Sequence, residues 1–166
     1  MQTKHADYRI LGVDPGLIVT GLGVVRAESG RCIFAGAQIV SPPVAEAMAA
    51  RLNRLYEEAS SFIAAAGARV MVVEKLIYAR NAQVALKLGH ARGVLLLAAA
   101  RAGIPVVEYT PREIKLAVSG NGAASKQQVQ RMVQAILSLP ALPEPHDVAD
   151  ALALAICHAH RVKAKA

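Results

Sequence analysis

Four acidic residues stand where predicted strands end or a predicted helix begins. Asp14 ends the apolar segment YRILGVD, and Glu74 ends the apolar segment VMVVE. Asp147 and Asp150 are three residues apart at the start of the last predicted helix, so both lie on one side of it. Side chains at strand ends of an α/β sheet line the crevice where ligands bind. The spacing therefore predicts that the four acids share one site.

Four carboxylates at one site repel one another unless cations lie between them. Oxygen-only ligation favours hard ions, and Mg²⁺ or Mn²⁺ fits best. A pair of such ions can activate a water and stabilise the leaving oxygen when a phosphodiester is hydrolysed. The acids therefore predict a two-ion hydrolase acting on phosphate esters.

Structural explanations remain for these acids. Asp147 and Asp150 can cap the amides of a first helical turn and offset the helix dipole. Asp14 precedes Pro-Gly and also suits a turn. Glu74 has no comparable structural explanation. His146, next to Asp147, could reach a metal or lie in solvent at the helix start.

The hydrophobic pattern predicts the elements that position these acids. Alternating and continuously apolar segments indicate strands, and apolar residues at helical spacing indicate helices. The expected strands are 8–14, 21–28, 32–40, 70–74 and 105–109, and the expected helices are 44–66, about 81–100, one opened by a capping box of Ser125 with Gln128, and 147–162. This order, βββαβαβαα with an antiparallel meander first, predicts an α/β fold.

Composition indicates one basic domain. The 166 residues, 54% of them apolar, suit a single domain over 1–166 with a core from about 8 to 162. A formal charge of +7 makes a polyanion a plausible partner. Cys32 and Cys157 suggest neither a disulfide framework nor a zinc ribbon. Because the N-terminus lacks an apolar leader and charges interrupt the stretch after Asn81, we expect a cytoplasmic protein that does not enter a membrane.

Three blocks of the sequence resemble a known family. They are LGVDPGLIVTGLGVV, VVEKLIYARNAQVALKLGHARGVLLLAAA and HDVADALALAICHAH, which are similar to the signature blocks of RuvC resolvases. The resemblance runs from about Ile10 to His160, and NAQVALKLGHARG is its most specific part. It implies a ribonuclease H-like fold with a mixed five-stranded sheet flanked by helices. It also implies symmetric, paired, metal-dependent cleavage of four-way (Holliday) DNA junctions in recombination and repair.

The resemblance also implies roles for particular residues. The family's four catalytic, metal-binding acids correspond to Asp14, Glu74, Asp147 and Asp150. Its two assisting basic residues correspond to Lys115 and Lys126, each of which could instead be a simple phosphate anchor or a solvated helix residue. The aromatic that family members insert into the junction centre is replaced here by Ile77 or Tyr78, either of which could instead be core. The full expected DNA-contacting set is Ile77, Tyr78, Arg80, Arg92, Lys115 and Lys126.

Partners follow from the same resemblance. Ala85, Gly89 and Gly93 recur at spacings of four along the helix of about 81–100, so another helix can approach closely, and the family implies a homodimer there. Packing of this helix on its own sheet is the other explanation. The resemblance further implies branch-migration partners of the RuvA/RuvB type.

Two other functions remain open. A YqgF-like nuclease shares the fold but has shorter chains that lack NAQVALKLGHARG. A catalytically silent junction-binding module would keep Arg80, Arg92, Lys115 and Lys126 but would not need four acids.

Overall fold

A mixed sheet forms the centre of the molecule. The computed structural model describes residues 8–75 and 82–163, so the predicted DNA contacts Ile77, Tyr78 and Arg80 lie outside the described residues. The strands lie in the order β3-β2-β1-β4-β5. They are β1 (Tyr8–Asp14), β2 (Thr20–Glu28), β3 (Arg31–Val40), β4 (Val70–Glu74) and β5 (Val106–Tyr109).

Strand direction changes within this sheet. β1, β2 and β3 pair antiparallel, as the predicted meander requires, whereas β4 runs parallel to β1 and β5 runs parallel to β4. β1 and β4 are buried over most of their length because helices cover both sheet faces, which explains their continuously apolar sequences. The predicted α/β class and mixed five-stranded sheet are confirmed.

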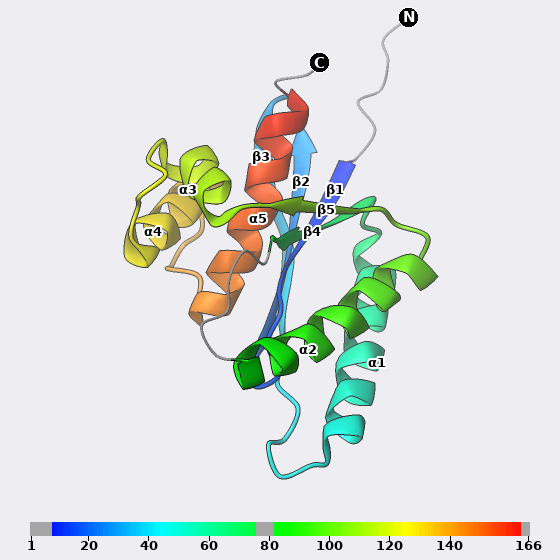
Figure 1. The fold of residues 1–166 in the computed structure, drawn as a ribbon. Helices are drawn as coiled ribbons and strands as arrows, with labels where there is room; N and C mark the ends of the chain where they lie inside the picture. The colour runs from blue at the N-terminus through cyan, green and yellow to red at the C-terminus, as the bar shows by residue number, and fades with distance from the viewer. Residues whose placement is uncertain (1–7, 76–81, 164–166) are drawn as a thin grey trace, which may run out of the picture.

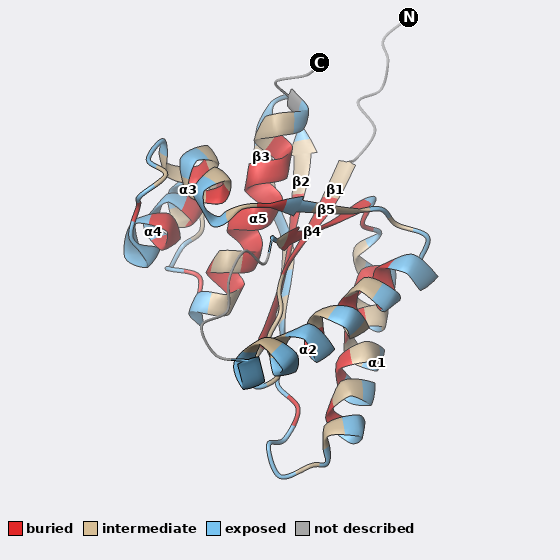
Figure 2. Cartoon of the chain, in the orientation of Figure 1, coloured by how far each residue is buried: buried red, intermediate tan, exposed pale blue. Residues whose placement is uncertain are grey.

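Helices cover the two faces of the sheet unequally (Figure 1). α1 and α2 lie on one face, and α3, α4 and α5 lie on the other, each layer with its own apolar cluster. Figure 2 shows that buried residues gather along α5 and along the central strands of the sheet. The helices are α1 (Met48–Ala66), α2 (Ala82–Arg101), α3 (Pro111–Ser119), α4 (Lys126–Leu137) and α5 (His146–Lys163).

The structure corrects two features of the predicted element order. The helix expected over 44–66 begins only at Met48, because Pro43 opens a turn that the Glu46 N–H closes on the Pro43 carbonyl at 3.1 Å. Helix α3 was not predicted. It begins with Pro111 after the capping residue Thr110, whose hydroxyl accepts from the Glu113 N–H. No helix in 8–75 or 82–163 is both long and apolar enough to cross a membrane.

Helix α5 lies unusually close to the sheet because glycines face it. A Cβ at Gly12 would lie 1.8 Å from the Ala151 carbonyl oxygen, and one at Gly21 would lie 2.1 Å from the Asp147 carbonyl oxygen. A third glycine, Gly23, would place its Cβ 2.8 Å from the Leu152 side chain. Only glycine permits this approach of helix backbone to strand backbone. The first turns of α5 are thereby held against the last residues of β1 and the first residues of β2.

Candidate active site

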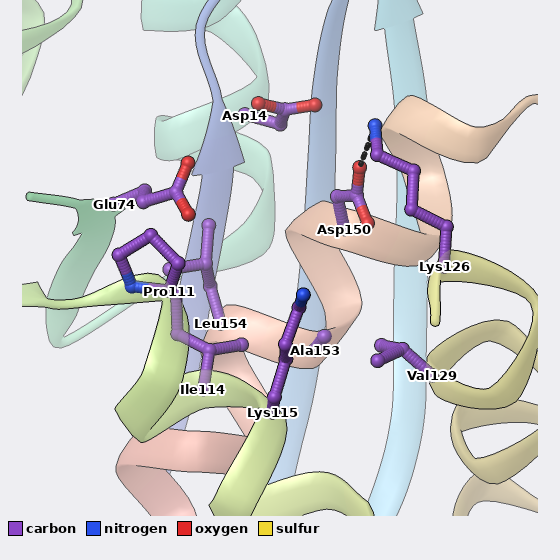
Figure 3. A pocket seen from close by; sticks show the side chains of 10 residues that line it. All are labelled: Asp14, Glu74, Pro111, Ile114, Lys115, Lys126, Val129, Asp150, Ala153 and Leu154. Carbon is purple, nitrogen blue, oxygen red and sulfur yellow. Dashed lines mark ion pairs between the residues drawn. The ribbon is translucent and has the colours of Figure 1, made fainter. Parts of the chain in front are cut away.

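Three of the predicted acids meet at the carboxyl ends of the central strands. Asp14 ends β1, Glu74 ends the neighbouring parallel strand β4, and Asp150 lies in the second turn of α5. Their side chains line one cleft of about 320 Å³ (Figure 3). The fourth acid, Asp147, is not among the cleft-lining residues, but its charge acts on both Asp14 and Asp150. All four acids therefore form one electrostatic group.

Two lysines reach the same cleft from the helices opposite. Lys126 is the first residue of α4, after the capping box of Ser125 and Gln128 that the sequence predicts, and its ammonium lies 3.7 Å from an Asp150 carboxylate oxygen. Lys115 belongs to α3, and Figure 3 shows its side chain directed into the cleft toward the acids. Both lysines predicted to assist catalysis therefore stand beside the carboxylates.

The remaining wall of the cleft is mostly apolar and was not predicted. It derives from α3, α4 and α5 and consists of Pro111, Ile114, Val129, Ala153 and Leu154. This wall removes water from the carboxylates on one side, which lowers the local dielectric and strengthens every charge interaction in the cleft. The Thr110-Pro111-Arg112-Glu113 helix start is a sequence signal that could have located the α3 part of this wall.

The carboxylates are held in an environment that opposes their charge. Burial, reinforced by the charges of Asp150, Asp147 and Glu74, raises the pKa of Asp14 from 3.8 to about 7. Burial also raises the pKa of Glu74 and of Asp150, with Lys126 opposing both shifts. Such clustered, mutually repelling acids are characteristic of functional sites.

Burial of Asp14 and the repulsion by its neighbours predict a stability cost that a single substitution removes. Because the pKa of Asp14 is near 7 in the folded protein and near 3.8 in the unfolded chain, the folded state holds its proton more tightly. The contribution of Asp14 to the free energy of unfolding is therefore fully present below about pH 4, and it is lost as the pH rises through 7. Without divalent cations, we expect Asp14→Asn to unfold at a higher temperature than wild type at pH 8 and at a similar temperature at pH 4. Equal unfolding temperatures at pH 8 would show that Asp14 is not strained by burial and its neighbours.

The donor set fits hard divalent cations. All four acids offer oxygen ligands, and a cation among them would offset the burial and the mutual repulsion that raise the pKa of Asp14, Glu74 and Asp150. Within the described ranges, no three His, Cys, Asp or Glu side chains yet stand close enough to enclose one ion. The residues thus have the chemistry for a metal site, but their side chains are not drawn together into a coordination shell.

Two other predicted positions have clear surroundings. His146 is exposed at the first residue of α5, and its charge lowers the pKa of Asp150. Arg92 lies on α2, with its side chain only 11% exposed, and donates to the Glu74 carbonyl and pairs with Glu108. A guanidinium enclosed in this way is poorly placed to contact a phosphate.

The predicted dimer face of α2 is exposed in this chain. Ala91, Leu95, Ala98 and Ala99 pack on the protein's own core, whereas nothing lies within 4 Å of a Cβ placed at Gly89 or Gly93. Three large apolar side chains on α2 are also exposed, Val84 at 58%, Leu86 at 65% and Leu97 at 53%. Gly89 and Gly93 therefore do not serve packing on the sheet.

The chain is similar over most of its length to proteins of known family. Residues 10–158 match the family model of crossover junction endodeoxyribonuclease RuvC. The crossover junction endodeoxyribonuclease RuvC of Moorella thermoacetica is 48% identical over 150 residues, which is 90% of each chain.

Solved structures agree with this match. The structure of Thermus thermophilus RuvC superposes with a TM-score of 0.86 at 33% identity and covers 95% of this chain and 96% of that one. A structure of T. thermophilus RuvC in complex with a Holliday junction substrate also gives a TM-score of 0.86, at 31% identity and the same coverage. The expected ribonuclease H-like fold is confirmed. On sequence and structure together, the chain belongs to the RuvC family of crossover junction endodeoxyribonucleases.

Proposed function

We propose that this protein resolves four-way DNA junctions by metal-dependent hydrolysis of phosphodiesters in recombination and repair. The observation that carries the proposal is the cleft in which Asp14, Glu74 and Asp150 face Lys115 and Lys126. A catalytically silent binding module would not need half-buried acids that repel one another. The family supplies the substrate class, since a relative of the same fold is recorded with a Holliday junction.

The acids would hold the metal ions that the family requires. The RuvC family is metal-dependent, and the oxygen-only donor set supports two Mg²⁺ or Mn²⁺ ions held by Asp14, Glu74, Asp147 and Asp150. When bound, such ions supply an activated water and stabilise the departing 3′ oxygen.

The lysines act on the phosphate itself. Lys115 and Lys126 enter the cleft from the side opposite the strand ends, so a phosphodiester lying across the cleft would meet positive charge there. A fixed ammonium stabilises the negative charge that develops on the phosphate oxygens in the transition state. Lys126 also offsets the charge of Asp150.

The working unit is a homodimer joined through α2. A junction is released only when two strands of like polarity are cut, and a two-fold dimer supplies two matched sites. The exposed face of Leu86, Gly89, Gly93 and Leu97 supports this contact because it is apolar and turned away from the protein's own core. Ile77 and Tyr78 follow shortly after Glu74 in the sequence, and we assign one of them to the junction centre, with Arg80 as a further DNA contact.

The cellular setting follows from the substrate. The relatives are bacterial, and bacterial DNA lies in the cytoplasm, where we place this protein. Branch-migration proteins of the RuvA/RuvB type would deliver the junction to it.

Substrate choice tests this function most directly. With Mg²⁺ or Mn²⁺ present, the protein should cut a mobile four-way junction and leave a linear duplex of the same sequences uncut. Paired strand cleavage on denaturing gels gives the result, and Glu74→Gln, which keeps the side-chain shape, serves as the inactive control. Equal cleavage of junction and duplex would favour a general nuclease, and binding without any cleavage would favour the silent module.

A further inference from the structure

Arg92 joins three elements at the end of β4. From α2, its Nη1 donates to the backbone carbonyl of Glu74 at 2.8 Å. Its Nη2 pairs with the carboxylate of Glu108 in β5. Because the Arg92 side chain is only 11% exposed, the guanidinium is committed to these partners within the protein.

The Glu74 carbonyl needs such a donor because its ladder partner is missing. The Lys75 N–H donates to the Tyr109 carbonyl of β5, so the backbone groups of the preceding residue, Glu74, face β1. The β1–β4 register reaches Val13 opposite Val73. One pair further, a parallel ladder would place the N–H of residue 15 on the Glu74 carbonyl. Residue 15 is Pro15 and has no N–H.

Pro15 has its own use at this place. A proline disfavours the helical conformation in the preceding residue and holds it extended. Pro15 thus keeps Asp14 in strand geometry up to the loop that follows, in which the Thr20 hydroxyl donates to the Gly16 carbonyl at 2.6 Å. The same proline removes the hydrogen bond that would fix the end of β4. Pro15 therefore restrains Asp14, but it leaves the Glu74 carbonyl without a hydrogen bond from β1.

We propose that Arg92 is a positioning residue: its guanidinium replaces the hydrogen bond that Pro15 cannot make and thereby fixes the direction of Glu74 in the cleft. Glu74 is the last residue of β4, and its carbonyl is tied to α2 by this contact with the largely enclosed Arg92 side chain. The inference rests on the proposed catalytic role of Glu74. Arg92 thus has a role within the protein in place of the phosphate contact that its charge alone suggests.

The first test separates positioning from DNA binding. Arg92→Met keeps an unbranched stem and removes every donor, so junction cleavage at saturating protein should fall about 100-fold, the size of effect expected when a partner that orients a metal ligand is lost. The junction Kd should stay within about 3-fold and its salt dependence should be unchanged. Lys126→Gln is the positive control and should lower the salt slope by about 0.9. Exposed Arg101 on the same helix gives the matched control, Arg101→Met, which should cut normally. A reduced salt slope for Arg92→Met would overturn the proposal in favour of a phosphate contact.

The second test restores the missing N–H. In Pro15→Ala, residue 15 can donate to the Glu74 carbonyl, so Arg92→Met should cost at most about 10-fold in that background, against about 100-fold beside Pro15. A merely structural arginine would cost the same in both backgrounds, and that additive result would overturn the proposal. Should Arg92→Met fail to fold, Arg92→Lys, which keeps one charged donor in a different geometry, enters the same cycle with the same criterion.

Two control substitutions show whether a negative result contradicts the Arg92–Glu74 contact or the proposed active site. Glu108→Gln removes the partner carboxylate, which is 43% exposed, and should change cleavage by no more than about 3-fold. A loss as large as that of Arg92→Met would assign the effect to the ion pair and overturn the carbonyl contact. If Glu74→Gln still cuts at the wild-type rate, the proposed active site fails. If Glu74→Gln is inactive and the Pro15 and Arg92 effects are additive, only the present inference fails.

Discussion

Asp14→Asn yields a protein that binds four-way junctions but does not cut them. The substitution keeps the shape of a side chain at the centre of the cleft and removes its charge, so cleavage should fall by about 10³-fold or more, beyond the loss expected for a supporting residue. The basic residues are unchanged, so the junction Kd should remain within a few fold. Cleavage rates under single-turnover conditions and gel-shift affinities give the two numbers.

A matched substitution shows whether the effect belongs to the cleft. Glu57 is an exposed acid of α1, and Glu57→Gln makes the same exchange of carboxylate for amide away from the site. It should cut like wild type. The carboxylate mechanism is wrong if Asp14→Asn retains a near wild-type cleavage rate. If Asp14→Asn also loses junction affinity, its loss of cleavage comes from impaired binding and not from a missing metal ligand.

Mixed dimers of wild-type and Asp14→Asn subunits should nick a supercoiled cruciform plasmid without linearising it. Each active site would cut one strand, so one competent site leaves the partner strand intact, whereas a wild-type homodimer cuts both. The expected result is a change of product from linear DNA to nicked circles. Agarose gels of dimers purified through two different affinity tags measure it.

The control for this experiment is a dimer of wild-type and Glu57→Gln subunits, which should give linear DNA. Mixed Asp14→Asn dimers that linearise the plasmid as well as this control would refute paired sites. So would a protein that sediments as a monomer while it resolves junctions.

The sequence predicts those parts of the fold that local pattern determines. The bounds of β1 and β4 match the structure because an apolar run that ends in an acid marks both the strand and its end. The capping box before α4 was found because its chemistry lies within four residues. Helix α3 was missed because its nine residues give too short a periodic pattern, although Thr110 and Glu113 carried the signature of its start.

Other features depend on contacts between distant segments. The charge of Arg92 suggests a phosphate partner, and only the position of α2 against the end of β4 reveals its bond to the Glu74 carbonyl. The glycines of β1 and β2 look like weak strand residues until α5 is seen against them. The apolar wall of the cleft comes from three helices, so no single stretch of sequence identifies it.

The contact of α5 with Gly12 and Gly21 also bears on motion. Most helix–sheet interfaces are padded by side chains that can change rotamer, so the two layers can shift by fractions of an ångström as those side chains rearrange. Here the Ala151 and Asp147 carbonyls rest directly on strand backbone, and no side chain lies between them to rearrange. The separation of Asp150 from Asp14 is therefore governed by backbone stiffness. We therefore expect this end of the cleft to be rigid, so that adjustment to a DNA substrate would come from helices α3 and α4, which carry Lys115 and Lys126.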